Sequence, residues 1–179
     1  MLLKTHMITS SAVVSFILFT ILDSYMLDYT LIYLTVGLGM LLAILVDNVI
    51  DKAGHKQIFT YAHGVIQKRT PLTHDIASAP IIGGSIGFIY GYAFMHLFRG
   101  IYVLELLDKY PIIFAIAGVL TALTHLFLDS LTEAGIFILG KRFRIAGFSY
   151  DNIPLNILFW LLSLMLLLYV FQPQAIFSA

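Results

Sequence analysis

The chain has 179 residues, of which 60% are hydrophobic and 11% are charged, and its formal net charge at pH 7 is zero. Soluble domains usually have about 25% charged residues, so this composition argues against a soluble globular protein. The neutral charge gives no indication of a nucleic-acid partner, because nucleic-acid-binding domains carry a basic surface. The chain has no cysteine, which excludes disulfides, iron–sulfur clusters and thiolate metal ligands.

The hydrophobic residues form five blocks, at residues 7–22, 29–46, 76–98, 111–128 and 153–171. Each block is near the roughly 20 residues that cross a bilayer as a helix. Backbone groups in lipid must be hydrogen-bonded within helices. We therefore expect an all-α fold over residues 1–179, a single-domain polytopic membrane bundle with about five transmembrane helices. The first block has no small-residue cleavage pattern before Asp23, so we expect it to remain in the mature protein.

Five crossings place the two ends of the chain on opposite sides of the membrane. The N-terminal side carries eight basic residues, Lys4, Lys52, Lys56, Lys68, Arg69, Lys141, Arg142 and Arg144, and the other side carries Arg99 and Lys109. The positive-inside rule then predicts a multi-pass protein of the plasma membrane, with its N-terminus in the cytoplasm and its C-terminus outside. We interpret the three cations at 141–144 as topology determinants that also attract anionic lipid.

Three further segments carry local predictions. Residues 47–66 could form a short interfacial helix, with Gly54 and Gly64 as its weak points. The segment around Pro71 is expected to be non-helical, because proline disfavours the α conformation in the residue before it. Small residues in GGSIGFIYG (83–91) predict a close helix–helix contact, within the chain or between chains. The sequence does not fix the oligomeric state.

The fourth block ends in THLFLDSLTEAG (124–135), which places His125, Asp129 and Glu133 four residues apart. On a helix this spacing puts all three side chains on one face. His6 precedes the first block, Asp47 ends the second, and His74 opens the third. In the predicted topology these residues all lie at the same end of their helices. Ionisable groups that converge at one membrane depth are costly without a function.

Imidazole nitrogens and carboxylate oxygens together suit a divalent metal, zinc first, with manganese or iron as alternatives. His125 and Asp129 could bind one ion from a single helix turn. Asp47 and Asp51 share that spacing, and His55 continues the row. The choice between the two aspartates stays open, as does the number of ions, one or two. The predicted metal ligands are His6, Asp47, His74, His125 and Asp129.

The order of these motifs resembles the family of YdjM-like membrane-bound metal-dependent hydrolases, in particular its archaeal branch. The resemblance covers most of the chain and rests on Thr5-His6, VDNVIDKAGH (46–55), RTPLTH (69–74), His125-x-x-x-Asp129-x-x-Thr132-x-x-Gly135 and YDNIPLN (150–156). It implies a helical membrane protein with a divalent-metal site and hydrolase activity.

The same ordering is similar to the soluble zinc-dependent phospholipase C and single-strand nuclease superfamily. That similarity implies a core zinc site at Asp47 or Asp51, His74, His125 and Asp129. Those enzymes use further downstream histidines for additional zinc ions, and this chain has no histidine after His125. One or two metals are therefore expected rather than three.

The leading hypothesis is a metal-dependent hydrolase that acts on a phosphoester or ester, with a small or lipid-like substrate, at the cytoplasmic membrane face. Arg69 would hold a substrate phosphate with its planar fork, and Glu133 or Asp51 would act as general base. A second hypothesis is a non-catalytic scaffold in which a closed metal or polar cluster joins the helices. A third, ion conduction, has little support, because the blocks offer mainly Ser15, Thr35, Ser85 and Ser163.

Overall fold

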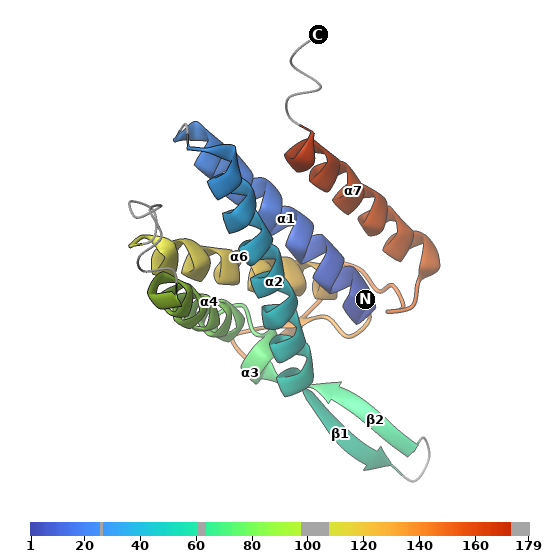
Figure 1. Ribbon diagram of the computed structural model, residues 1–179. Helices are drawn as coiled ribbons and strands as arrows, with labels where there is room; N and C mark the ends of the chain where they lie inside the picture. Colours follow the sequence, from blue (N-terminus) through green and yellow to red (C-terminus); the bar gives the residue numbers. More distant parts are fainter. Residues whose placement is uncertain (26, 61–63, 98–107, 173–179) are drawn as a thin grey trace.

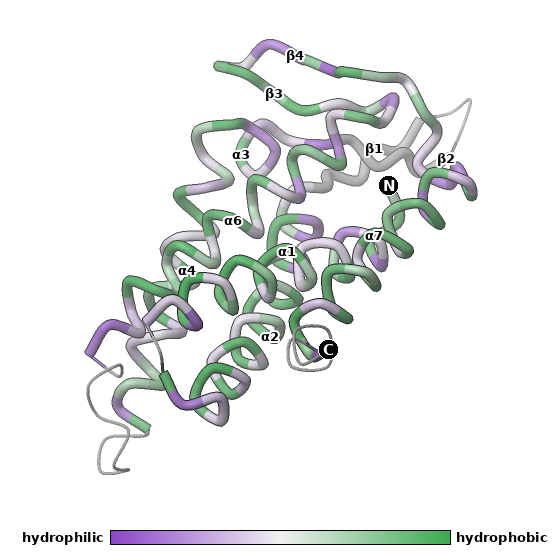
Figure 2. The backbone as a smooth tube through the Cα atoms, turned by 90° about the horizontal axis from the view of Figure 1, so that it is seen from above, coloured by the Kyte–Doolittle hydropathy of each residue, from purple (hydrophilic) through white to green (hydrophobic). Residues whose placement is uncertain are grey.

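A computed structural model describes the chain except residues 26, 61–63, 98–107 and 173–179. In the described residues five helices are long and apolar enough to cross a bilayer (Figure 1). They are α1 (Leu3–Ser24), α2 (Tyr29–Gly54), α4 (Ser78–Leu97), α6 (Tyr110–Ser130) and α7 (Ile153–Phe171). The predicted five-span helical membrane bundle is confirmed. Figure 2 shows hydrophobic residues predominating along these helices.

The ends of the helices follow local sequence signals. Pro111 and Pro154 occupy the first turns of α6 and α7, where a missing backbone N–H costs nothing. The Asn152 side chain accepts a hydrogen bond from the Leu155 backbone N–H at 3.0 Å and so caps α7. Helix α2 extends eight residues beyond its predicted end, because Val46, Asp47 and Ile50 continue its buried face.

The segment after α2 corrects one prediction. The predicted interfacial helix over residues 47–66 is wrong for the described residues beyond Gly54, because strands β1 (His55–Thr60) and β2 (Gly64–Arg69) pair antiparallel there. Ile58 and Phe59 in β1, and Val65 and Ile66 in β2, favour extended backbone over helix. At the base of the hairpin the Thr70 backbone N–H donates to the Gly54 carbonyl at 2.8 Å. The beginning of β1 and the end of β2 therefore both lie at the C-terminal end of α2.

Helix α3 (Pro71–His74) corrects a second prediction, because Pro71 begins a single helical turn instead of a non-helical segment. Thr70, the residue before the proline, is extended, with ψ at 146°, as the proline rule requires. Proline itself is tolerated as the first residue of a helix. From the sequence, His74 is expected to begin the third membrane helix. In the structure it instead ends the short helix α3, and α4 begins at Ser78.

Glycines bring α4 and α6 into backbone contact. A Cβ atom on Gly83 would collide with the carbonyl oxygen of Gly118, and one on Gly87 would collide with that of Phe114. Small residues at four-residue spacing allow this approach between membrane helices. The predicted close helix contact thus exists within the chain.

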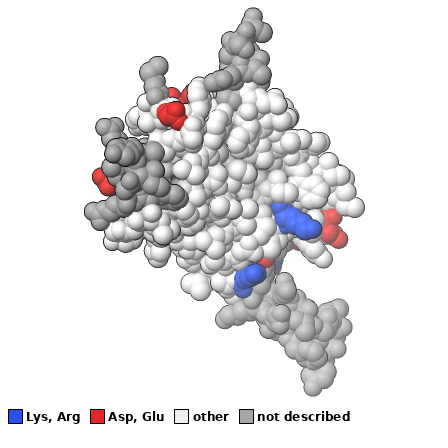
Figure 3. Space-filling model, in the orientation of Figure 1, with Lys and Arg blue, Asp and Glu red and all other residues white. Residues whose placement is uncertain are grey.

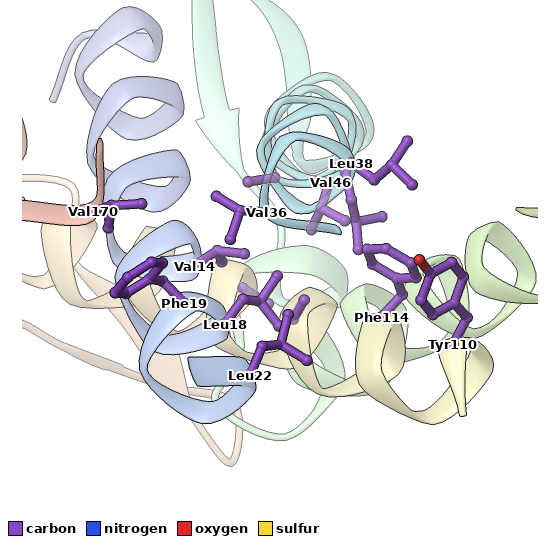
Figure 4. Packing of buried hydrophobic residues seen from close by; sticks show 14 of the residues in the cluster. Val14, Leu18, Phe19, Leu22, Val36, Leu38, Val46, Tyr110, Phe114 and Val170 are labelled. Carbon is purple, nitrogen blue, oxygen red and sulfur yellow. The ribbon is translucent and has the colours of Figure 1, made fainter. Parts of the chain in front are cut away.

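Helices α1, α2 and α6 share the apolar core, in which Val14, Leu18, Val36 and Phe114 are buried (Figure 4). Helix α7 lies beside α1 (Figure 1) and is joined to it by polar contacts. The Thr5 hydroxyl donates to Asn156 Oδ1 at 2.5 Å, and the Ser163 hydroxyl donates to Thr9 Oγ1 at 3.2 Å. Hydrogen bonds of this kind hold membrane helices together where lipid gives no hydrophobic driving force.

A second hairpin joins α6 to α7. Its strands are β3 (Ile136–Ile138) and β4 (Lys141–Phe143), paired antiparallel. It lies at one edge of the bundle in Figure 2. The Lys and Arg side chains visible in Figure 3 lie toward the molecular end that carries the N-terminus in Figure 1. Of the basic residues counted in the sequence, Arg99 lies outside the described residues.

Candidate metal site

Four elements bring histidine and aspartate side chains together at one end of the bundle. Helix α1 contributes His6, α2 contributes Asp47 and Asp51, α3 contributes His74, and α6 contributes His125 and Asp129. All except Asp51 are 0–1% exposed. Such residues are rarely buried in lipid without a partner or a ligand.

The Asp129 carboxylate is the centre of the cluster. Its Oδ1 atom lies 3.2 Å from His6 Nε2, and its Oδ2 atom lies 3.4 Å from both His74 Nε2 and His125 Nε2. The i, i+4 spacing of His125 and Asp129 on α6 brings the imidazole and the carboxylate together, as the sequence predicts. Three imidazole nitrogens from three elements therefore face one carboxylate.

These separations fit ligands that share a metal ion. Zinc binds imidazole nitrogen and carboxylate oxygen at about 2.0–2.1 Å, so two ligands of a tetrahedral site lie about 3.3–3.4 Å apart. His125 Nε2 and Asp129 Oδ2 are both buried and have no hydrogen-bond partner. Buried polar atoms without a partner call for an explanation, and an ion between them would supply one.

Within the described part of the chain, two overlapping groups could hold an ion. One consists of His6, His125 and Asp129, and the other of Asp51, His74 and His125; within each, the ligand atoms lie within 4.8 Å of one another. His125 belongs to both groups. Five candidate ligands are more than one tetrahedral ion uses, so the arrangement has room for one ion or two.

Asp47 belongs to neither group, although the sequence predicts it as a ligand. Its Oδ1 atom lies 3.0 Å from His125 Nδ1, on the ring nitrogen that faces away from Asp129. Histidines that bind metals commonly donate their other N–H to a carboxylate, which fixes the tautomer and the ring orientation. In the structure Asp51 therefore lies in a group of candidate ligands, whereas Asp47 contacts the far ring nitrogen of His125.

Arg69 covers the carboxylate that the histidines face. Its guanidinium donates to Asp129 Oδ1 at 2.5 Å and to the Gly135 carbonyl at 3.0 Å, and it lies 3.3 Å from Thr132 Oγ1. The α-amino group of Met1 lies 3.8 Å from the same Oδ1 atom. Arg69 and Met1 thus contact Oδ1 of Asp129, whereas Oδ2 faces His74 and His125. Arg69, which is predicted from the sequence to hold a substrate phosphate, binds a protein carboxylate in this structure.

Two neighbours of His74 were missed by sequence reasoning. The Thr73 hydroxyl lies 2.9 Å from His74 Nδ1 and holds the ring so that Nε2 faces Asp129. A Cβ atom on Gly54 would collide with Thr73 Oγ1 and with the His74 ring. The contact between α2 and α3 therefore requires glycine at position 54. Only the Thr-His pair in RTPLTH gave a signal for Thr73.

Glu133 is not on the helical face of His125 and Asp129. Helix α6 ends at Ser130, so the four-residue rule no longer applies three residues further on. Glu133 is exposed and belongs to neither metal group. Its backbone N–H donates to the Phe148 carbonyl at 2.9 Å. The structure gives no support to Glu133 as a general base of this site.

Among the residues that the structure describes, no other histidine belongs to the two metal groups. Helix α2 ends at Gly54, so His55 begins β1 and does not continue the helical row of Asp47 and Asp51. His96 is exposed at the opposite end of α4, with its ring 4.4 Å from that of Tyr92. His63 lies outside the described residues.

Residues 1–128 match the model of a family described as protein of unknown function, DUF1286. The chain belongs to this DUF1286 family. The match contains four of the five candidate ligands, and Asp129 follows it directly. Comparisons with curated proteins and with solved structures found no match.

Proposed function

We propose that this DUF1286 protein is a membrane-bound metal-dependent hydrolase with its site at the cytoplasmic ends of the helices. The observation that supports it best is the set of three Nε2 atoms at 3.2–3.4 Å from the Asp129 carboxylate oxygens, all buried. In this proposal the protein lies in the plasma membrane with its N-terminus in the cytoplasm, as the charge distribution predicts. The resemblance to YdjM-like hydrolases is consistent with the proposal.

The donor set favours zinc. Three imidazoles and carboxylates form a mixed nitrogen and oxygen site, which also suits manganese or ferrous iron. His6, Asp51, His74, His125 and Asp129 would hold one or two ions. When bound, such an ion activates water for attack on an ester or phosphoester. In this proposal the site, at the ends of the membrane helices, is near the lipid headgroups, which supports a lipid-like substrate.

The chain's own residues position these ligands. Asp47 fixes the His125 ring, Thr73 fixes the His74 ring, and Arg69 fixes the Asp129 carboxylate. Arg69 also neutralises one negative charge in a buried place, where an unpaired carboxylate would be unfavourable. Three separate supports for three ligands give the preorganisation that a metal site needs.

A structural metal is the second candidate, and the burial of the ligands favours it. Structural zinc sites are closed by four protein ligands, whereas catalytic sites keep a position for water. Replacement of the metal by Co²⁺ separates the two candidates. A catalytic site predicts that the Co²⁺ absorption bands change when azide or inorganic phosphate is added. A closed site predicts bands that neither anion alters, and this result would overturn the hydrolase proposal.

The metal site itself is tested by metal analysis of the purified chain in detergent. We expect near-stoichiometric metal in the wild type and its loss in the His125→Ala, Asp129→Ala double variant. His96→Ala removes an exposed histidine at the far end of α4 and is the matched control. Equal metal content in all three proteins would refute the site. A screen with phosphodiester and carboxylic-ester substrates in lipid, with Zn²⁺ or Mn²⁺ added, then identifies the reaction.

A further inference from the structure

The β3–β4 hairpin carries an exposed apolar tip. Leu139 and Gly140 connect the strands with φ angles of 50° and 79°. Leu139 is the only non-glycine residue with positive φ among the described residues, and its side chain is 83% exposed. A two-residue turn of this form favours asparagine or glycine, so leucine is a strained choice. A strained and exposed leucine in water has no structural benefit, which points to a function at this position.

Basic side chains surround this tip. Lys141 and Arg142 lie on β4, and Arg144 follows it. Exposed apolar residues lie among them, because Phe143 is 45% exposed and Ile145 is 60% exposed. Alternating cations and apolar side chains are typical of segments that lie in the membrane interface, with the apolar groups toward the acyl chains. The hairpin connects the ends of two candidate membrane helices, α6 and α7, on the side that the charge distribution predicts to be cytoplasmic.

A cavity of about 310 Å³ opens beside the hairpin, lined by Glu133, Arg142, Phe143 and Arg144. Arg142 is held in place, since its Nε atom donates to the Ala134 carbonyl at 2.7 Å. The lining carries two positive charges and one negative charge. The net charge of the lining is therefore +1. This charge balances the single negative charge of a lipid phosphodiester, whereas a doubly charged free phosphate would leave an excess negative charge.

The hairpin is also fixed to the bundle. The Gly140 backbone N–H donates to Asp75 Oδ2 at 3.2 Å, and the Ile76 backbone N–H donates to the Phe137 carbonyl at 3.0 Å. The Ile145 backbone N–H donates to the Ser130 carbonyl at 2.8 Å, at the end of α6. The cavity wall therefore has a defined position relative to the membrane helices.

We propose that the β3–β4 hairpin and Glu133 form a binding site for the headgroup of an anionic phospholipid. Arg142 and Arg144 hold the phosphodiester, and Leu139 and Phe143 contact the acyl chains of the same lipid layer. The site contains none of the candidate metal ligands. It therefore stands whether or not the chain is a hydrolase.

The test uses the full chain in nanodiscs of phosphatidylcholine with a minor fraction of phosphatidylglycerol. Native mass spectrometry then measures the phosphatidylglycerol that the protein retains on release. We expect the Arg142→Gln, Arg144→Gln variant to lose retention about tenfold, because two charge-assisted contacts are removed. The matched control is Lys4→Gln, Lys52→Gln, which removes the same charge from exposed positions on the same membrane side and should retain the lipid. Equal retention in the two variants would overturn the proposal.

Two further measurements identify the ligand and guard against misfolding. Leu139→Asn suits the turn, so the hairpin is kept, and we expect phosphatidylglycerol retention to fall because the apolar contact is lost. Retention at the wild-type level would contradict the role of the tip. Added inorganic phosphate should leave the lipid in place. If inorganic phosphate displaces phosphatidylglycerol, the cavity binds free phosphate and the lipid assignment is wrong.

Discussion

His125 Nδ1 lies 3.0 Å from Asp47 Oδ1, while Nε2 of the same ring lies 3.4 Å from Asp129 Oδ2. One imidazole therefore links two buried carboxylates on two helices, α2 and α6. Metal affinity and the position of α2 should depend on each other through this ring.

Asp47→Asn tests that dependence. The amide keeps the size of the side chain but weakens the hold on the His125 tautomer, so we expect metal affinity to fall by about 10–100-fold. Competition with a chromophoric chelator measures the affinity. Asp23→Asn, at the exposed far end of α1, is the control and should bind metal like the wild type. Equal affinities in the two variants would show that Asp47 does not support the site.

Arg69→Gln removes the cation that covers Asp129. The buried carboxylate then loses its closest charged partner, so we expect the metal-free protein to lose about 3 kcal/mol or more of stability. Thermal unfolding in detergent measures the change. Arg69→Lys restores the charge but not the two-pronged contact with Asp129 and Gly135, so it should recover only part of the loss. Full recovery by lysine would mean that charge alone matters.

Gly87→Ala tests the contact between α4 and α6. The new methyl group meets the Phe114 carbonyl, which is backbone and cannot turn aside, so we expect a loss of about 1–3 kcal/mol. Gly37→Ala is the matched control, because nothing lies within 4 Å of a Cβ atom there. That substitution in α2 should be neutral or stabilising, since alanine is the better helix former. Chemical or thermal unfolding in detergent ranks the two.

Asn156→Leu tests how α7 is held. Asn156 Oδ1 accepts from the Thr5 hydroxyl, and Asn156 Nδ2 donates to the carbonyls of Tyr150 and Asn152. We expect a loss of about 0.6–1.7 kcal/mol, the range of hydrogen bonds between membrane helices. Crosslinking between cysteines introduced on α1 and α7 should fall as α7 separates. Gln172→Leu, at the other end of α7, should leave both measurements unchanged.

The sequence predicted the helices well because each is a long apolar block with few alternatives in lipid. It also predicted which residues gather, since helix direction alone brings His6, His74 and His125 to one end. It could not separate Asp47 from Asp51, because both lie on the same helix face and only the rotation of α2 against α6 decides between them. Glu133 was misplaced for a different reason: the end of α6 at Ser130 carries no proline or glycine signal.

The β-hairpin after α2 was missed because its segment is polar and carries no strict alternation. Because the hairpin was missed, the contact between Arg69 and Asp129 was missed as well. Asp129 is 60 residues away from Arg69, and the hairpin is what returns the chain to the site. Sequence spacing has no information about such a contact.

The hydrogen bond from Thr70 to Gly54 has a practical use. It closes the base of β1 and β2, so β1 leaves the bundle and β2 returns to it at the same point. A folded domain inserted between the two strands would extend from the bundle while Arg69 keeps its contact with Asp129. On a 20.0 kDa membrane protein, such an insertion would serve as a fiducial for electron cryomicroscopy. With a fluorescent reporter in the same place, the side of the membrane on which the site faces could be read directly in living cells.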